Sequence, residues 1–160
     1  MNRNCEWPIF IISLPDAEER RSPLVKALSS VGLNYEIFNA VDARQGVPPQ
    51  YREMVDIPGM KEQFGRLMSA PEIGCALSHI LVYRKMIKCR LPGALILEDD
   101  TVWSDAATTL LRELEPGEVD FLQLDYGWAD IWRFAPAHPP GAAGVKFKRL
   151  AKNAGLANCY

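Results

Sequence analysis

Short apolar runs alternate with segments of helical spacing in the first part of this chain, which predicts alternating strands and helices. The run Ile9–Leu14 is β-branched and apolar at odd and even positions, as in a central strand covered on both faces. Residues 16–31 then carry leucines and valines at helical spacing up to Gly32, and Tyr35–Phe38 predicts a second strand. A strand, a helix and a strand within about thirty residues favour parallel pairing in an α/β sheet.

The start of the first helix can be placed in two ways. Asp16 and Glu19 have the spacing of a capping box, which would begin the helix directly after the first strand. Ser22 and Pro23 resemble an N-cap followed by a first-turn proline, which would begin a second helical segment. The sequence leaves both arrangements open.

The middle of the chain passes from an irregular stretch into a long helix. Residues 46–68 are interrupted by prolines and glycines, which predicts a surface excursion with one short helix. Ser69–Glu72 offers a helix start with a first-turn proline, and we expect this helix to reach Cys89. Gly74 and Ser78, four residues apart, predict a narrow helix face that packs closely on the sheet. The expected apolar positions are Ile73, Leu77, Ile80, Leu81 and Ile87.

A further buried strand is predicted at Ala94–Leu97, and it ends abruptly in the acidic run Glu98-Asp99-Asp100. Downstream, the pattern predicts a short helix over Asp105–Leu114 and a strand over Asp120–Asp125. An exposed edge strand is predicted over Val145–Lys148.

Length and composition fit one folded domain. The chain has 160 residues, of which 48% are apolar and 24% charged, so disordered and fibrous classes are excluded. It stops at Tyr160, soon after the last predicted strand. We therefore expect a single domain over residues 1–160 that is truncated at its C-terminal side.

Net charge and cysteine content limit the partners, the cellular compartment and the metal sites that this chain can have. Eighteen basic and 20 acidic residues give a net charge of −2, so no bulk positive field is available to hold nucleic acid. No apolar run approaches the roughly 18 residues of a spanning helix, and the start carries no export-signal pattern, which favours the cytoplasm. The absence of a C-x-x-C motif, with only two histidines, excludes the usual zinc-ligand spacings and predicts free thiols. The four cysteines are Cys5, Cys75, Cys89 and Cys159.

The acidic run is the main candidate for chemistry. Open α/β sheets bind their ligands at the carboxyl ends of strands, which is where Glu98, Asp99 and Asp100 lie. If the backbone stays extended, Glu98 and Asp100 project on one side and Asp99 on the other. Such carboxylates suit Mg²⁺ or Mn²⁺, and the ion can neutralise the charge of a departing diphosphate. The alternative is a solvated turn, or a cap for the next helix.

Four sequence blocks carry a resemblance to a known family. They follow one another in the order and spacing of glycosyltransferase family 25, which contains bacterial lipooligosaccharide galactosyltransferases and collagen galactosyltransferase relatives. The resemblance extends over about residues 8 to 125. The blocks are IFIISLPDAEERR (Ile9–Arg21), FNAVDA (Phe38–Ala43), PEIGCALSH (Pro71–His79) and ALILEDDTV (Ala94–Val102).

The resemblance implies a GT-A-like nucleotide-sugar-binding fold with a mostly parallel central sheet flanked by helices. It also implies inverting transfer of a hexose, commonly from UDP-galactose, to a glycan or glycolipid acceptor such as lipopolysaccharide. A peripheral position at the inner face of a membrane comes with that family. Its metal motif matches the acidic run: we expect Asp100 to bind Mn²⁺ or Mg²⁺, Glu98 to share the ion directly or through water, and Asp99 to face the donor's ribose or sugar.

Three other side chains are candidates for donor binding. Arg20 follows the first strand and suits phosphate, with a solvent-facing pair to Glu18 or Glu19 as the alternative. Asp42 could accept hydrogen bonds from uridine or simply end a strand in a turn. His79 could reach donor groups or serve as a packed scaffold residue.

The general base is left unassigned. An inverting transferase needs one near the acceptor hydroxyl, and Asp125, which ends a predicted strand on the same sheet edge, is a candidate without further support in the sequence. Two other functions stay open: a transferase-like module that binds nucleotide sugar without turnover, and an Mg²⁺-dependent phosphatase or phosphotransferase. The latter requires a nucleophilic aspartate after the first strand, where the sequence has Asp16 inside a helix start.

Overall fold

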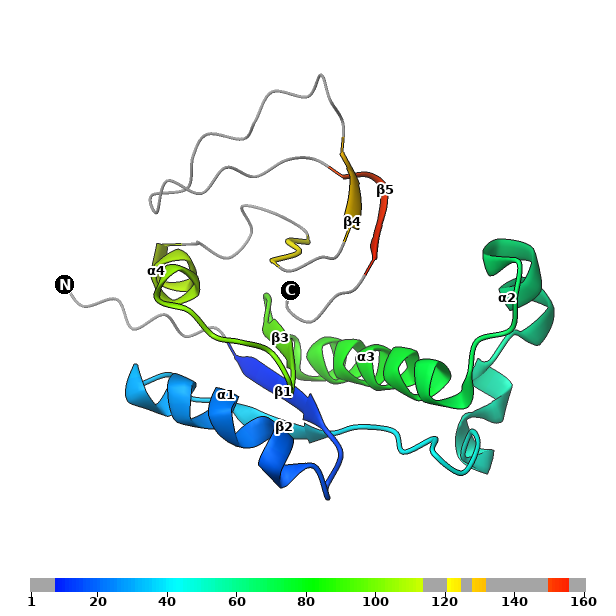
Figure 1. Ribbon diagram of the computed structural model, residues 1–160, viewed down its shortest axis with the longest axis horizontal. Coiled ribbons are helices and arrows are strands. Elements are labelled where there is room, and N and C mark those ends of the chain that lie inside the picture. Colours follow the sequence, from blue (N-terminus) through cyan, green and yellow to red (C-terminus); the bar gives the residue numbers. More distant parts are fainter. Residues whose placement is uncertain (1–7, 114–120, 125–127, 132–149, 156–160) are drawn as a thin grey trace.

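The computed structural model describes residues 8–113, 121–124, 128–131 and 150–155 (Figure 1). Its centre is a three-stranded parallel sheet in the order β2-β1-β3, which confirms the predicted α/β class. All five residues of β1 (Ile9–Ser13) are buried, because this strand has a neighbour on each side and helices on both faces. Ile12 pairs in register with Phe38 of β2 and Glu98 of β3. The outer strands are β2 (Glu36–Asn39) and β3 (Leu95–Glu98).

The first helix, α1 (Glu18–Ser30), is continuous. Pro23 lies inside it, so the prediction of a second segment beginning at Pro23 is wrong. The predicted capping box is also wrong: Ala17 is the N-cap, without a side-chain bond, and Asp16 pairs with Arg44 instead. The chain leaves the helix at Gly32, which has a φ of 72° and so takes the left-handed conformation that glycine favours.

Two apolar layers sandwich the sheet, with α1 and α3 on opposite faces (Figure 1). Alternation along each strand sorts its side chains between these layers. The layer beneath α1 also contains Leu111 of α4 (Asp105–Glu113). Its strand and α1 members are Ile9, Ile11, Leu24, Leu28, Leu95 and Leu97. The layer beneath α3 contains Phe10, Ile12, Val82 and Ile96.

The excursion between β2 and α3 (Ala70–Cys89) holds two short helices, where the sequence predicted one. They are the 3-10 helix η1 (Pro49–Met54) and α2 (Ile57–Phe64), whose N-cap Asp56 accepts a hydrogen bond from the Gly59 amide. Side chains from this stretch pack on a third apolar cluster around the start of α3, centred on Val41, Ile73 and Leu77. The excursion therefore covers one end of α3.

The start of α3 confirms the predicted helix boundary. Ser69 and Glu72 form a reciprocal capping box, and Arg66 forms an ion pair with Glu72. Arg66 and these cap bonds lower the pKa of Glu72 to about 2. The helix ends at Cys89, and Arg90 follows in the left-handed conformation with a φ of 53°.

The buried face of α3 differs in part from the predicted one. Ile80 and Ile87 are 38% and 77% exposed, whereas Val82 is fully buried. The buried face is therefore rotated toward the small residues Gly74 and Ser78, which are both buried. An added Cβ at Gly74 would lie 2.8 Å from the Val41 carbonyl oxygen, and Ser78 Oγ accepts a 2.8 Å hydrogen bond from the Val41 amide. The predicted close packing of the narrow face is confirmed, but its partner is the segment that follows β2 and not the sheet itself.

The later part of the chain departs most from expectation. Residues 121–124 carry no regular secondary structure, so the strand predicted over 120–125 is wrong in this part. An apolar run becomes a strand only where a partner backbone lies in register, and sequence spacing does not supply that partner. The structure instead pairs β4 (Trp128–Ile131) with β5 (Leu150–Gly155) in antiparallel fashion, and residues 145–148 lie outside the described ranges.

Among the described residues, no helix has the length and apolar content needed to span a membrane.

The close contact at Gly74 makes a prediction about stability. Replacing Gly74 with alanine should destabilise the protein, because overpacking against Val41 and Ala43 costs about 1–3 kcal/mol and exceeds the roughly 1 kcal/mol that alanine gains in a helix. The control is Ala76→Gly at an exposed position of the same helix, which should lose about 1 kcal/mol. Urea unfolding measures both. A more stable Gly74→Ala variant would contradict the close packing.

Candidate functional site

The candidate site lies at the carboxyl edge of the parallel sheet. From β1 the chain crosses to β2 on one side and later returns to β3 on the other side of β1. The order of the strands therefore reverses between β1 and β3. Ligands of open α/β sheets bind in the crevice outside such a switch point. The acidic run after β3 is at this position.

The end of β3 sends neighbouring carboxylates to opposite faces. Leu97 lies in the α1 layer and Ile96 in the α3 layer, and the alternation continues so that Glu98 meets α3 and Asp99 meets α1. The amide of Thr101 then donates a 3.1 Å hydrogen bond to the Glu98 carbonyl, which closes a turn. The assumption of extended backbone through residue 100 is therefore wrong, and the turn leaves Asp100 exposed.

Asp99 forms an ion pair with Arg20. Its carboxylate is fully buried, and its Oδ1 lies 2.5 Å from a guanidinium nitrogen of Arg20, whose side chain is 58% exposed. Among the described residues no group donates a hydrogen bond to the buried Asp99 Oδ2. The close ion pair with Asp99, together with the charges of Asp100 and Glu98, raises the pKa of Arg20 above its ordinary value. Arg20 therefore pairs across the sheet edge and not with Glu18 or Glu19.

Glu98 meets two side chains from α3. Its Oε1 lies 3.3 Å from His79 Nε2 and accepts a 3.7 Å hydrogen bond from the Cys75 thiol. Cys75 and His79 are one helical turn apart, so they face the same strand end. Partial burial, the charge and hydrogen bond of Glu98, and the charge of Asp100 together raise the pKa of Cys75 to about 11. The sequence predicts Cys75 only as a free thiol, and the structure confirms this.

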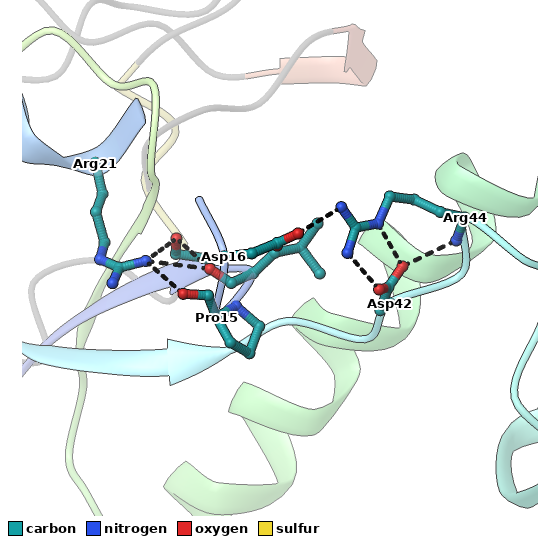
Figure 2. Close-up of polar contacts among 7 residues, drawn as sticks. Pro15, Asp16, Arg21, Asp42 and Arg44 are labelled. Atoms are coloured by element: carbon teal, nitrogen blue, oxygen red, sulfur yellow. Dashed lines mark hydrogen bonds and ion pairs between the residues drawn. The ribbon is translucent and has the colours of Figure 1, made fainter. Parts of the chain in front are cut away.

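A second charged cluster joins the loops that follow β1 and β2. Arg44 donates to Asp16 Oδ2 at 2.8 Å and to Asp42 Oδ2 at 2.6 Å, and Figure 2 shows it lying between the two carboxylates. Hydrogen bonds from Arg44 lower the pKa of Asp42 to about 2 and also lower the pKa of Asp16. Both oxygens of Asp42 accept from Arg44, a residue that the pattern analysis did not single out.

Arg21 has a scaffold position beside this cluster. Its guanidinium donates to the Leu14 carbonyl at 3.1 Å and to the Pro15 carbonyl at 3.5 Å, as the dashed lines of Figure 2 show. It also reaches the Ser13 hydroxyl at 3.4 Å. Arg21 therefore fixes the loop that leaves β1, whereas its neighbour Arg20 meets the acidic run.

The structure thus divides the candidate residues into groups. Arg20, Asp99 and Asp100 gather at the switch point, where Glu98 also meets His79. Asp42 lies in the cluster with Arg44 beyond β2. The candidate base Asp125 lies outside the described residues.

The oxygen donors at the switch point suit a hard divalent cation. Asp100 offers an exposed carboxylate and Glu98 a half-buried one, whereas Asp99 is fully buried and paired with Arg20. Mg²⁺ and Mn²⁺ prefer such ligands and keep several waters. The neighbouring Arg20 guanidinium matches a phosphate. A cation and a diphosphate could therefore bind side by side here.

Comparison with known proteins identifies the family. The model for glycosyltransferase family 25, described as an LPS biosynthesis protein, matches residues 6–149. The chain belongs to glycosyltransferase family 25. The four sequence blocks that carried this resemblance supply Arg20, Asp42, His79 and the acidic run.

Curated relatives of this family 25 chain match parts of it. A glycosyltransferase 25 family member of Drosophila pseudoobscura pseudoobscura is 37% identical over 95 residues, which is 58% of this chain and 15% of the relative. Procollagen galactosyltransferase 2 of Mus musculus is 29% identical over 74% of this chain and 19% of its own length. The probable inactive glycosyltransferase 25 family member 3 of Rattus norvegicus is 28% identical over 78% and 22%. The chain spans less than a quarter of each.

The ion pair at the switch point predicts an effect on stability. Arg20→Ala should cost about 1–3 kcal/mol, because it leaves the buried Asp99 carboxylate unpaired; solvent around Arg20 keeps the loss below that of a fully buried pair. Lys26→Ala, at an exposed position of the same helix, should change stability by less than about 0.5 kcal/mol. Adding Asp99→Asn to Arg20→Ala should restore part of the loss. Urea unfolding curves measure all three, and equal midpoints for Arg20→Ala and Lys26→Ala would contradict the assignment.

The ion pairs of Arg44 with Asp16 and Asp42 should make the stability of the folded protein depend on pH in the acid range. The pKa values of Asp16 and Asp42 are lower in the folded protein than the ordinary value of 3.8, and that of Asp42 is about 2. The stability that they contribute is complete above pH 3.8 and is lost as the pH falls toward about 2. Melting temperature should therefore fall less steeply between about pH 4 and 2 in Arg44→Gln than in the wild type. If the melting temperatures of the two proteins fell equally with pH, the Arg44 cluster would not contribute to the pH dependence of stability.

Proposed function

We propose that this chain forms the donor-binding part of a metal-dependent, inverting glycosyltransferase with a GT-A type arrangement. It would move a hexose, in the first instance galactose, from a UDP-sugar to a glycan acceptor. Family membership supports transfer of a sugar, and relatives named procollagen galactosyltransferase support galactose. The family description supports a lipopolysaccharide acceptor, which would place the protein in the cytoplasm at the inner face of a membrane.

The observation that carries the proposal is the charge arrangement at the switch point. An exposed carboxylate, a half-buried carboxylate and a partly exposed arginine lie together at the carboxyl edge of the sheet, on Asp100, Glu98 and Arg20. A nucleotide sugar presents a diphosphate, whose oxygens bind both arginine and a divalent cation. This arrangement of charges is therefore complementary to the diphosphate of a nucleotide sugar.

Each residue has a proposed role. Asp100 would bind Mn²⁺ or Mg²⁺, with Glu98 sharing the ion directly or through water; when bound, the ion neutralises the charge of the departing diphosphate. Arg20 has N–H groups beyond the one held by Asp99, and these would donate to a phosphate oxygen. Asp99 is fully buried and would affect donor binding indirectly, by fixing the orientation of Arg20. His79 and Asp42 are the further proposed donor contacts.

The test is nucleotide binding with and without the cation. We expect UDP and UDP-galactose to raise the melting temperature of the protein in Mn²⁺ and much less in a chelator, because a ligand that binds only the folded state stabilises it. Calorimetry should show at least a tenfold loss of Mn²⁺-dependent UDP affinity in Asp100→Asn, equivalent to about 1.4 kcal/mol.

The control for this variant is Glu62→Gln, an exposed carboxylate on α2. It should bind UDP as the wild type does. The melting temperature of unliganded Asp100→Asn should equal that of the wild type, since Asp100 is exposed and its loss removes no packing. Unchanged UDP affinity in Asp100→Asn, or equal losses in both variants, would refute the metal assignment.

A second candidate function is a transferase-like module that binds the donor without turnover. The rat relative named as a probable inactive family member supports it. Both functions predict Mn²⁺-dependent UDP binding, so turnover separates them. Hydrolysis of UDP-galactose, or transfer of its sugar to a glycan, by the purified chain would establish an enzyme; binding without either would favour the module.

A further inference from the structure

We propose that Cys75, His79 and Glu98 form a binding site for Zn²⁺, with a fourth coordination position open to water. Their potential ligand atoms, one from each residue, all lie within 4.8 Å of one another. Two of the residues come from a single turn of α3, and the third comes from the end of β3. The site shares Glu98 and His79 with the proposed donor site, but its thiol and imidazole suit a softer metal, and it needs no nucleotide.

The distances agree with the edges of a tetrahedron around zinc. Bond lengths of about 2.0–2.1 Å to nitrogen and oxygen and about 2.3 Å to sulfur place tetrahedral N and O ligands about 3.3 Å apart, and S and O ligands about 3.6 Å apart. The structure has 3.3 Å between His79 Nε2 and Glu98 Oε1, and 3.7 Å between Cys75 Sγ and the same oxygen. Two of the three distances between ligand atoms therefore already fit zinc, and the third, between Cys75 and His79, is within 4.8 Å.

The ligand set selects the metal. A thiolate and an imidazole suit Zn²⁺, whereas Mg²⁺ and Mn²⁺ prefer oxygen donors. Without metal, the Cys75 thiol keeps its proton and donates a hydrogen bond to Glu98. When zinc binds, the S–Zn bond replaces the S–H bond and the proton passes to solvent, because the cation stabilises the thiolate.

The surroundings hold these ligands in position. Gly74 and Ser78 precede Cys75 and His79 by one residue each, and they fix the helix against the segment after β2 through the Ser78–Val41 hydrogen bond. Successive residues of a helix point in different directions. Cys75 and His79, each one position after a packed residue, therefore face Glu98 at the end of β3. Among the described residues no other histidine, cysteine or carboxylate joins this group, which leaves a position for water.

The test uses the full chain, stripped of metal and kept reduced. Co²⁺, which takes the place of zinc, should produce a thiolate charge-transfer band and the absorption of a tetrahedral centre, and Zn²⁺ should displace it. Cys75→Ser should abolish the charge-transfer band, and His79→Gln should weaken Co²⁺ binding at least tenfold. Circular dichroism confirms that each variant is folded.

The matched control is Cys89→Ser, the exposed free thiol at the end of the same helix, which should bind Co²⁺ as the wild type does. Asp100→Asn should also retain the Co²⁺ spectrum while losing Mn²⁺-dependent UDP binding, so the two proposals can fail separately. Absence of the charge-transfer band, its persistence in Cys75→Ser, or its loss in Cys89→Ser would overturn the zinc site.

Discussion

The arrangement of the candidate site depends on the ion pair between Arg20 and Asp99. A fully buried carboxylate is tolerated only when a cation or hydrogen-bond donors compensate for the loss of water. Arg20, the third residue of α1, supplies that cation across the edge of the sheet. The pair ties α1 to the end of β3, and the turn at that end leaves the next carboxylate, Asp100, in solvent.

Successive side chains at the end of β3 point to opposite faces of the sheet, where they meet different kinds of groups. On the α1 side, Asp99 meets an arginine, an arrangement that favours anion recognition beside a hard cation. On the α3 side, Glu98 meets an imidazole and a thiol, which are ligands of softer metals. The docking of α3 through Gly74 sets this second group, because a bulkier residue would move the helix away from Val41. The end of β3 therefore supplies one carboxylate to each face of the sheet, Asp99 to the α1 face and Glu98 to the α3 face.

Several of the strands and helices that position the site were predictable from residue type and spacing. The apolar run of β1, the start of α3 at Ser69 and the acidic end of β3 follow from residue type and spacing alone, since strand burial and helix capping are local properties. The same approach failed at residues 121–124 and at the start of α1. At 121–124 no described strand lies in register beside the apolar run, and at the start of α1 Asp16 pairs with the distant Arg44 instead of capping the helix.

The sequence by itself determined that carboxylates end a buried strand and that an arginine follows the first strand, because short-range patterns specify these elements. It also carried the family, through blocks distributed along the chain. Only the tertiary structure decided which partner each carboxylate takes: Asp99 with Arg20, Glu98 with His79 and Cys75, and Asp42 with Arg44. The strand order β2-β1-β3 and the rotation of α3 fix the first two of these pairings, and both arise from packing between residues far apart in the chain.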